Sequence, residues 1–123
     1  MTEIKHNEMV SALAKPGADI INDLSPMKAH LWHMASCIQG EAGELFDAIK
    51  KPVIYNKGVF DRENIVEELG DIEFYMEGLR QALGISRDET IEANIVKLAV
   101  RYREGTYSNE QAQARADKEQ ANG

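Results

Sequence analysis

Apolar residues recur every three to four positions through the middle of the chain, which is the spacing of amphipathic helices. Apolar stripes on successive segments with short connections are typical of an antiparallel helical bundle. We therefore predict an all-α fold, an antiparallel bundle of four to five helices. Three stripes carry this prediction: Leu31, Met34, Ala35, Ile38, Ala42, Leu45 and Ile49; Ile65, Leu69, Ile72, Met76, Leu79 and Leu83; Ile91, Ile95, Leu98 and Tyr102.

A few apolar residues lie off these stripes, namely Phe74, Val96 and Val100. They indicate a second buried face on the later helices. A second buried face on a small helical domain is typical of a homo-oligomer. We therefore expect a homodimer or homotetramer to complete the bundle.

The first long helix is expected to begin at the pair Ser25-Pro26. Serine is a good N-cap, and proline fits the first helical position because its missing N–H has no partner there. Pro52 is expected to end the helix at about Lys51, since the residue before a proline avoids helical geometry. The stretch 52–60 then reads as a loop.

Two further helices follow this loop. Asp61 is the expected N-cap of a helix that runs to about Leu83, where Gly84 terminates it in the usual way. The next helix is expected over 87–104, stopped by Gly105. The sequences Ser86-x-x-Glu89 and Ser108-x-x-Gln111 are capping boxes that begin this helix and a polar terminal one.

The length of 123 residues fits a single domain over 1–123. Residues 1–24 are expected to form a weakly helical N-terminal arm, with a helix over 4–14 that Pro16 breaks. Residues 117–123 are polar and are expected to fray.

The formal net charge of −7 argues against bulk binding to nucleic acid or to an anionic membrane, because both need a basic face. No apolar run approaches the ~20 residues of a membrane helix. Cys37 is the single cysteine, which excludes an intrachain disulfide and is typical of a reducing compartment. We expect a cytoplasmic protein.

Two carboxylate pairs share one spacing, Glu41-x-x-Glu44 and Glu68-x-x-Asp71. Residues three apart on a helix are neighbours on one face, and like charges that close need a cation or protons to offset their repulsion. Both pairs fall on the same-handed shoulder of their apolar stripes. Oxygen ligands favour Mg²⁺, with Mn²⁺ as a possible substitute.

A third helix carries Asn94, Lys97 and Arg101 on the corresponding shoulder. Packing by the stripes would bring acidic and basic columns to one cleft. Charges that flank an apolar stripe are, however, also typical of ordinary solvated helix surfaces. Spacing alone leaves both interpretations open.

The residues around these positions resemble the MazG-like branch of the all-α NTP pyrophosphatases. Gly40-Glu41-Ala42-Gly43-Glu44-Leu45 and Glu67-Glu68-Leu69-Gly70-Asp71-Ile72 match its E-x-x-E and E-x-x-D motifs. Asn94-Ile95-Val96-Lys97-Leu98-Ala99-Val100-Arg101-Tyr102 looks like its N-x-x-K-L-x-x-R-Y segment, and the resemblance covers about 27–115. Compact versions occur in bacteria and phages, so the resemblance implies the cytoplasm of a bacterial or phage-infected cell.

The resemblance implies hydrolysis of a nucleoside triphosphate to the monophosphate and pyrophosphate with Mg²⁺. It makes Glu41, Glu44, Glu68 and Asp71 metal ligands, and it lets Asn94, Lys97 and Arg101 contact phosphates. A metal-activated water would attack a phosphate, with Glu41 or Glu44 as base, and Lys57 in the loop could close over the substrate. Many members carry an acidic residue where this chain has Gly40, which leaves the number of metals open.

Two other functions remain open on the sequence. One is a non-catalytic helical module that binds nucleotide or a partner protein. The other is a relative of narrow specificity, such as a dUTP or dCTP pyrophosphatase or a phosphoribosyl-ATP pyrophosphohydrolase. Pyrophosphate release from a panel of triphosphates separates these three functions.

Overall fold

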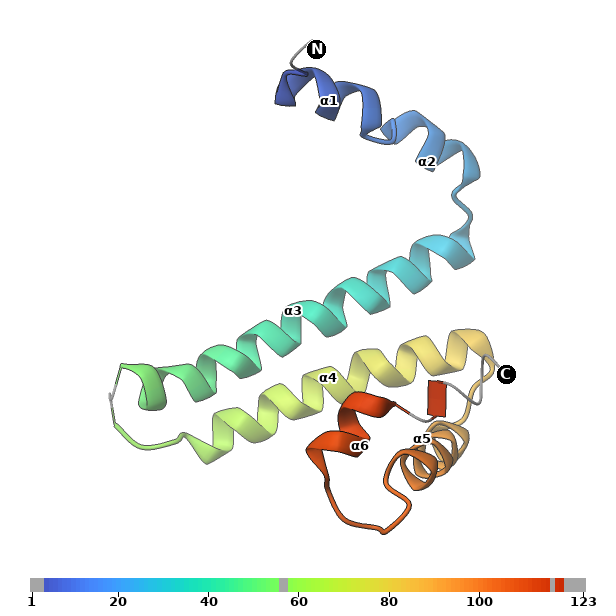
Figure 1. The fold of residues 1–123 in the computed structure, drawn as a ribbon. Coiled ribbons are helices and arrows are strands. Elements are labelled where there is room, and N and C mark those ends of the chain that lie inside the picture. The colour runs from blue at the N-terminus through green and yellow to red at the C-terminus, as the bar shows by residue number, and fades with distance from the viewer. Residues whose placement is uncertain (1–3, 56–57, 116, 119–123) are drawn as a thin grey trace.

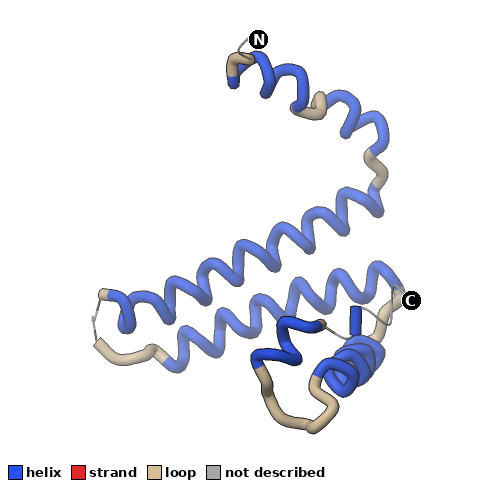
Figure 2. Tube along the Cα trace, viewed as in Figure 1, coloured by secondary structure: helices blue, strands red, loops and turns tan. Residues whose placement is uncertain are grey.

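The computed structural model of the chain describes residues 4–55, 58–115 and 117–118. Across these ranges the fold is helical and contains no strand, so the predicted all-α class is confirmed (Figures 1 and 2). The elements are α1 (His6–Leu13), α2 (Gly17–Asp23), α3 (Pro26–Ile54), α4 (Arg62–Leu83), α5 (Arg87–Arg101) and α6 (Asn109–Ala114).

The centre of the fold is an antiparallel hairpin of α3 and α4, which pack along their length (Figure 1). Both helices begin at the predicted caps. The Ser25 side chain accepts a hydrogen bond from the Lys28 backbone N–H at 3.1 Å, and the Asp61 side chain accepts one from the Asn64 N–H at 3.1 Å. These caps fix where each helix starts, and so which residues the hairpin can place opposite one another.

Pro52 does not end α3, contrary to expectation: the helix continues to Ile54 with this proline inside it. A proline removes the hydrogen bond of its own N–H and crowds the carbonyl four residues before it. In the last turn that loss affects few residues, so the helix ends three residues later than predicted.

The later helices begin as expected but end differently. Ser86 and Ser108 each accept a hydrogen bond from the backbone N–H three residues on, as capping residues do. However, α5 ends at Arg101 rather than near Glu104. The chain turns early because the Gly105 N–H donates to the Tyr102 carbonyl at 3.0 Å, with φ of +75° at Gly105.

The N-terminal arm forms two helices instead of the single one expected. Pro16 does interrupt α1, but its carbonyl accepts from the Asp19 N–H at 3.1 Å and it serves as the N-cap of α2. A proline that breaks one helix is well suited to precede the next, because its fixed φ of −62° needs no N–H there. The arm extends away from the hairpin (Figure 1).

The described chain buries very little apolar surface on its own. Met34 is its one buried apolar residue, at 7% exposed, and its sulfur lies against the α4 backbone at Gly78. Large apolar residues on every long helix are exposed, among them Trp32, Phe46, Phe74 and Ile95. No helix in the described ranges is both long and apolar enough to span a membrane.

Candidate functional site

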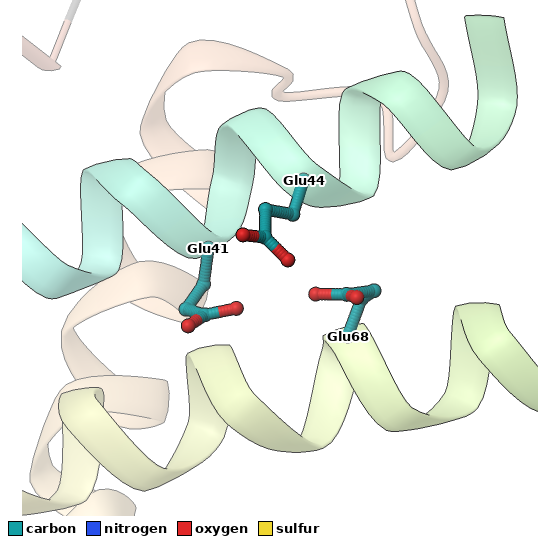
Figure 3. A group of neighbouring side chains, drawn as sticks. All are labelled: Glu41, Glu44 and Glu68. Atoms are coloured by element: carbon teal, nitrogen blue, oxygen red, sulfur yellow. The ribbon is translucent and has the colours of Figure 1, made fainter.

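The α3–α4 hairpin brings three of the four predicted metal ligands together. Glu41 and Glu44 point from successive turns of α3 toward Glu68 on α4 (Figure 3). Each offers one carboxylate oxygen, and the three oxygens lie within 4.8 Å of one another. We call Glu41, Glu44 and Glu68 the carboxylate trio.

The trio is held at an electrostatic cost. The pKa of Glu68 is raised above its ordinary value, first by burial and then by the charges of Glu44 and Glu41. One oxygen of Glu41 and one of Glu68, both Oε2, are buried with no hydrogen-bond partner. Buried carboxylate oxygens without partners are unfavourable, so these two atoms favour a positive group at the site.

A divalent cation fits these residues. Three oxygen donors around one point are the donor set that Mg²⁺ and Mn²⁺ prefer, and water or phosphate oxygens can fill the remaining positions. A cation would also give the two orphaned Oε2 atoms a partner. The residues therefore fit the metal that the sequence predicted.

Asp71 lies apart from the trio. It is exposed, one turn beyond Glu68 on the same helix, and is not one of the three converging ligands. The charge of Asp71 still makes the smallest contribution to the raised pKa of Glu68, so Asp71 lies near Glu68 without being part of the trio. Its role as a metal ligand stays a prediction.

A polar hollow of about 450 Å³ adjoins the trio toward the α3–α4 connection. Glu44 and Glu68 form its edge, and Asp47, Asp61 and Asn64 line it further out. Asp47 was not predicted, although it extends the three-residue spacing of Glu41 and Glu44 by one more step. The spacing rule that gave the pairs could therefore have found it.

The basic column on α5 is not part of the trio. Helix α5 starts after the turn at the far end of α4; Glu68 and Leu83 are separated by fifteen residues of helix, about 22 Å at 1.5 Å per residue. Asn94 is exposed and Lys97 half-buried. Lys57, the predicted loop contact, lies outside the described residues.

Arg101, the third residue of this column, has a protein partner. Its Nε donates to Asp117 Oδ1 at 2.9 Å, and the two side chains are 16% and 8% exposed. This hydrogen bond raises the pKa of Arg101. Burial acts to raise the pKa of Asp117, but the hydrogen bond and charge of Arg101 outweigh it, so the pKa is lowered overall.

The sequence gave no indication of the contact between Arg101 and Asp117. The two residues are sixteen positions apart, and Asp117 opens the segment 117–123 that was expected to fray. Its side chain is instead shielded against α5, while 119–123 lie outside the described part of the chain. Only the packing of Asp117 on α5 creates this pair.

Comparison with known proteins connects this geometry to a family. The family model of the MazG nucleotide pyrophosphohydrolase domain matches residues 30–106, a span that includes the trio, Asp71 and the basic column. Searches of curated proteins and of solved structures found no match. The matched span is well over half of the chain, and the chain therefore belongs to the MazG nucleotide pyrophosphohydrolase domain family.

Proposed function

We propose that this protein is a Mg²⁺-dependent nucleoside triphosphate pyrophosphohydrolase, which converts a (d)NTP and water to the (d)NMP and pyrophosphate. The single observation that carries the proposal is the carboxylate trio, with its two buried, unpartnered oxygens. Family membership supports the reaction class. Mn²⁺ is the expected substitute metal.

In this proposal the acidic residues divide two tasks. Glu41, Glu44 and Glu68 hold the metal, with Asp71 one turn away as a fourth ligand. A bound divalent cation supplies Lewis acidity toward phosphate oxygens and lowers the pKa of water. Glu41 or Glu44 accepts the proton as the water attacks the α-phosphorus, and pyrophosphate leaves.

The basic residues then bind the substrate. A triphosphate is strongly repelled by a chain of net charge −7 unless local positive charge offsets it. Lys97 and Arg101, with Asn94 beside them, contact the phosphates in this proposal. Lys57, which lies outside the described residues, stays a further predicted contact. Lys97 serves as a point charge and Arg101 as a planar donor fork.

A substrate panel tests the function. The purified protein is incubated with Mg²⁺ and each of the common NTPs and dNTPs, and the monophosphate and pyrophosphate are measured. We expect equimolar release of both products from at least one triphosphate, and none when EDTA replaces Mg²⁺. Mg²⁺-dependent binding without pyrophosphate would instead identify a non-catalytic module, and turnover of a single nucleotide would identify a narrow-specificity relative.

We also propose that the working form is a homodimer or homotetramer. The chain exposes 10233 Å², whereas a folded monomer of 13.8 kDa is expected to expose roughly 6,600 Å². The difference is of the order that obligate interfaces bury, and the exposed surface includes apolar stripes that a second copy would cover. Under two-fold symmetry, the same apolar surface of each copy would contact the other copy.

Size-exclusion chromatography with light scattering tests this assembly. We expect a mass of two or four chains for the native protein. Phe74→Glu, at a side chain that is 68% exposed, should lower the mass, because it places a charge on a proposed interface. Val59→Glu, at an 89% exposed residue of the connection, is the control and should leave the mass unchanged. A monomeric, fully helical native protein would rule the assembly out.

A further inference from the structure

The contact between Arg101 and Asp117 differs from the other ion pairs in the described ranges. In the pairs of Lys28 with Asp23 and of Arg80 with Glu73 and Glu77, the acidic side chains are 46–80% exposed. Here both partners are shielded, at 16% and 8%. A carboxylate shielded from water is unfavourable without a positive partner, so the contact with Arg101 stabilises Asp117 in its position against α5.

An aspartate carboxylate resembles a phosphate group toward an arginine. Both offer anionic oxygens that accept charge-assisted hydrogen bonds from a guanidinium at 2.7–2.9 Å, and arginine binds either in the same geometry. The 2.9 Å distance from Arg101 Nε to Asp117 Oδ1 is a distance that a phosphate oxygen would adopt. While the contact lasts, no phosphate oxygen can reach that Nε.

We propose that Asp117 is an internal competitor for the phosphate-binding Arg101, so that its contact with Arg101 holds the enzyme in a state of reduced substrate affinity. The inference rests on the proposed function, in which Arg101 contacts the triphosphate. Substrate must displace Asp117 to engage Arg101. The carboxylate lies three residues beyond the end of α6, so its displacement does not require this helix to unfold.

The pair involves one member of the basic column. Arg101 is the member of that column that forms an ion pair in the described ranges, while Asn94 and Lys97 lie earlier on α5. A competitor at Arg101 therefore acts on one phosphate contact and leaves the metal site unaffected. The expected consequence is a change in substrate affinity rather than in the chemical step.

The test compares Asp117→Asn with the native full-length chain. Asparagine keeps the shape of the side chain and removes its charge. Calorimetric titration with inorganic tripolyphosphate and Mg²⁺ should show roughly tenfold tighter binding by the variant, since the competent state is no longer depleted. In turnover assays KM should fall by a similar factor while kcat stays the same or rises. Glu110→Gln removes an exposed negative charge on α6 and should change neither value.

Two further variants decide the cause. In an Arg101→Gln background, Asp117→Asn should have no effect on tripolyphosphate affinity, because Asp117 acts through Arg101. Asp117→Ala should reproduce the gain if asparagine disturbs folding, which circular dichroism reports. Weaker or unchanged tripolyphosphate binding by both folded Asp117 variants overturns the inference. Because tripolyphosphate binding needs no turnover, this outcome is distinct from a failure of the proposed enzymatic function.

Discussion

Replacing Glu68 by Gln is expected to reduce triphosphate turnover by at least the roughly 10- to 100-fold that loss of an outer-shell metal partner costs. The amide keeps the side chain's size but offers only one neutral oxygen where the trio needs an anionic one. Glu68 is the only member of the trio that α4 supplies, so its charge cannot be replaced from α3. Pyrophosphate release at saturating Mg²⁺ measures the effect.

The neighbouring Glu67 provides a matched control. It is exposed, it carries the same charge on the same turn of α4, and it is not among the converging ligands. Glu67→Gln should keep nearly full activity. Equal activity of the Glu68→Gln and native proteins, or equal losses in both variants, would show that the trio is not the metal site.

The second large effect concerns the same residue: the order of stability of the native protein and Glu68→Gln should reverse when Mg²⁺ is added. Without metal, Glu68→Gln is expected to melt at a higher temperature than the native protein at pH 7, because it removes a carboxylate whose charged form the fold disfavours. With Mg²⁺ at about a hundredfold excess over its Kd, the native protein should gain roughly 5–10 °C and the variant very little. Differential scanning calorimetry, with EDTA and with Mg²⁺, measures both values.

The sign of the pH dependence follows from the raised pKa of Glu68. Between its ordinary value of 4.5 and the raised value, the native state holds more protons than the unfolded state. The contribution of Glu68 to the free energy of unfolding therefore falls as pH rises through this window. The metal-free advantage of Glu68→Gln should grow from pH 4 to pH 7.

The pKa of Asp117 is shifted in the opposite direction to that of Glu68. For this reason the Glu68→Gln variant and the native protein are compared with each other at every pH. The pKa of Asp117 is lowered, so its stabilising contribution is lost as pH falls through that lowered value. The native protein and the Glu68→Gln variant both contain Asp117, so its contribution cancels in the difference between their melting temperatures. A melting-temperature difference that does not change with pH would contradict the electrostatic account of the trio.

The caps and apolar stripes allowed much of the fold to be predicted from the sequence. Ser25, Asp61, Ser86 and Ser108 each cap a helix as predicted, because an N-cap depends on a side chain and a backbone N–H only three residues away. Errors arose where tertiary or turn geometry competes with local preference, as at Pro52 inside α3. Helix α2 was missed because Pro16 was read only as the end of α1.

The sequence by itself determined the all-α class, the starts of α3 to α6 and the faces on which the acidic pairs lie, since these depend on contacts within one or two helical turns. Only the tertiary structure decided which members of the pairs meet. The spacing fixes a residue's face but not the rotation and axial offset of two packed helices. That offset places Glu68 opposite Glu41 and Glu44 and leaves Asp71 one turn away. The packing of Asp117 on α5 gives Arg101 its partner. No local sequence pattern predicts this contact.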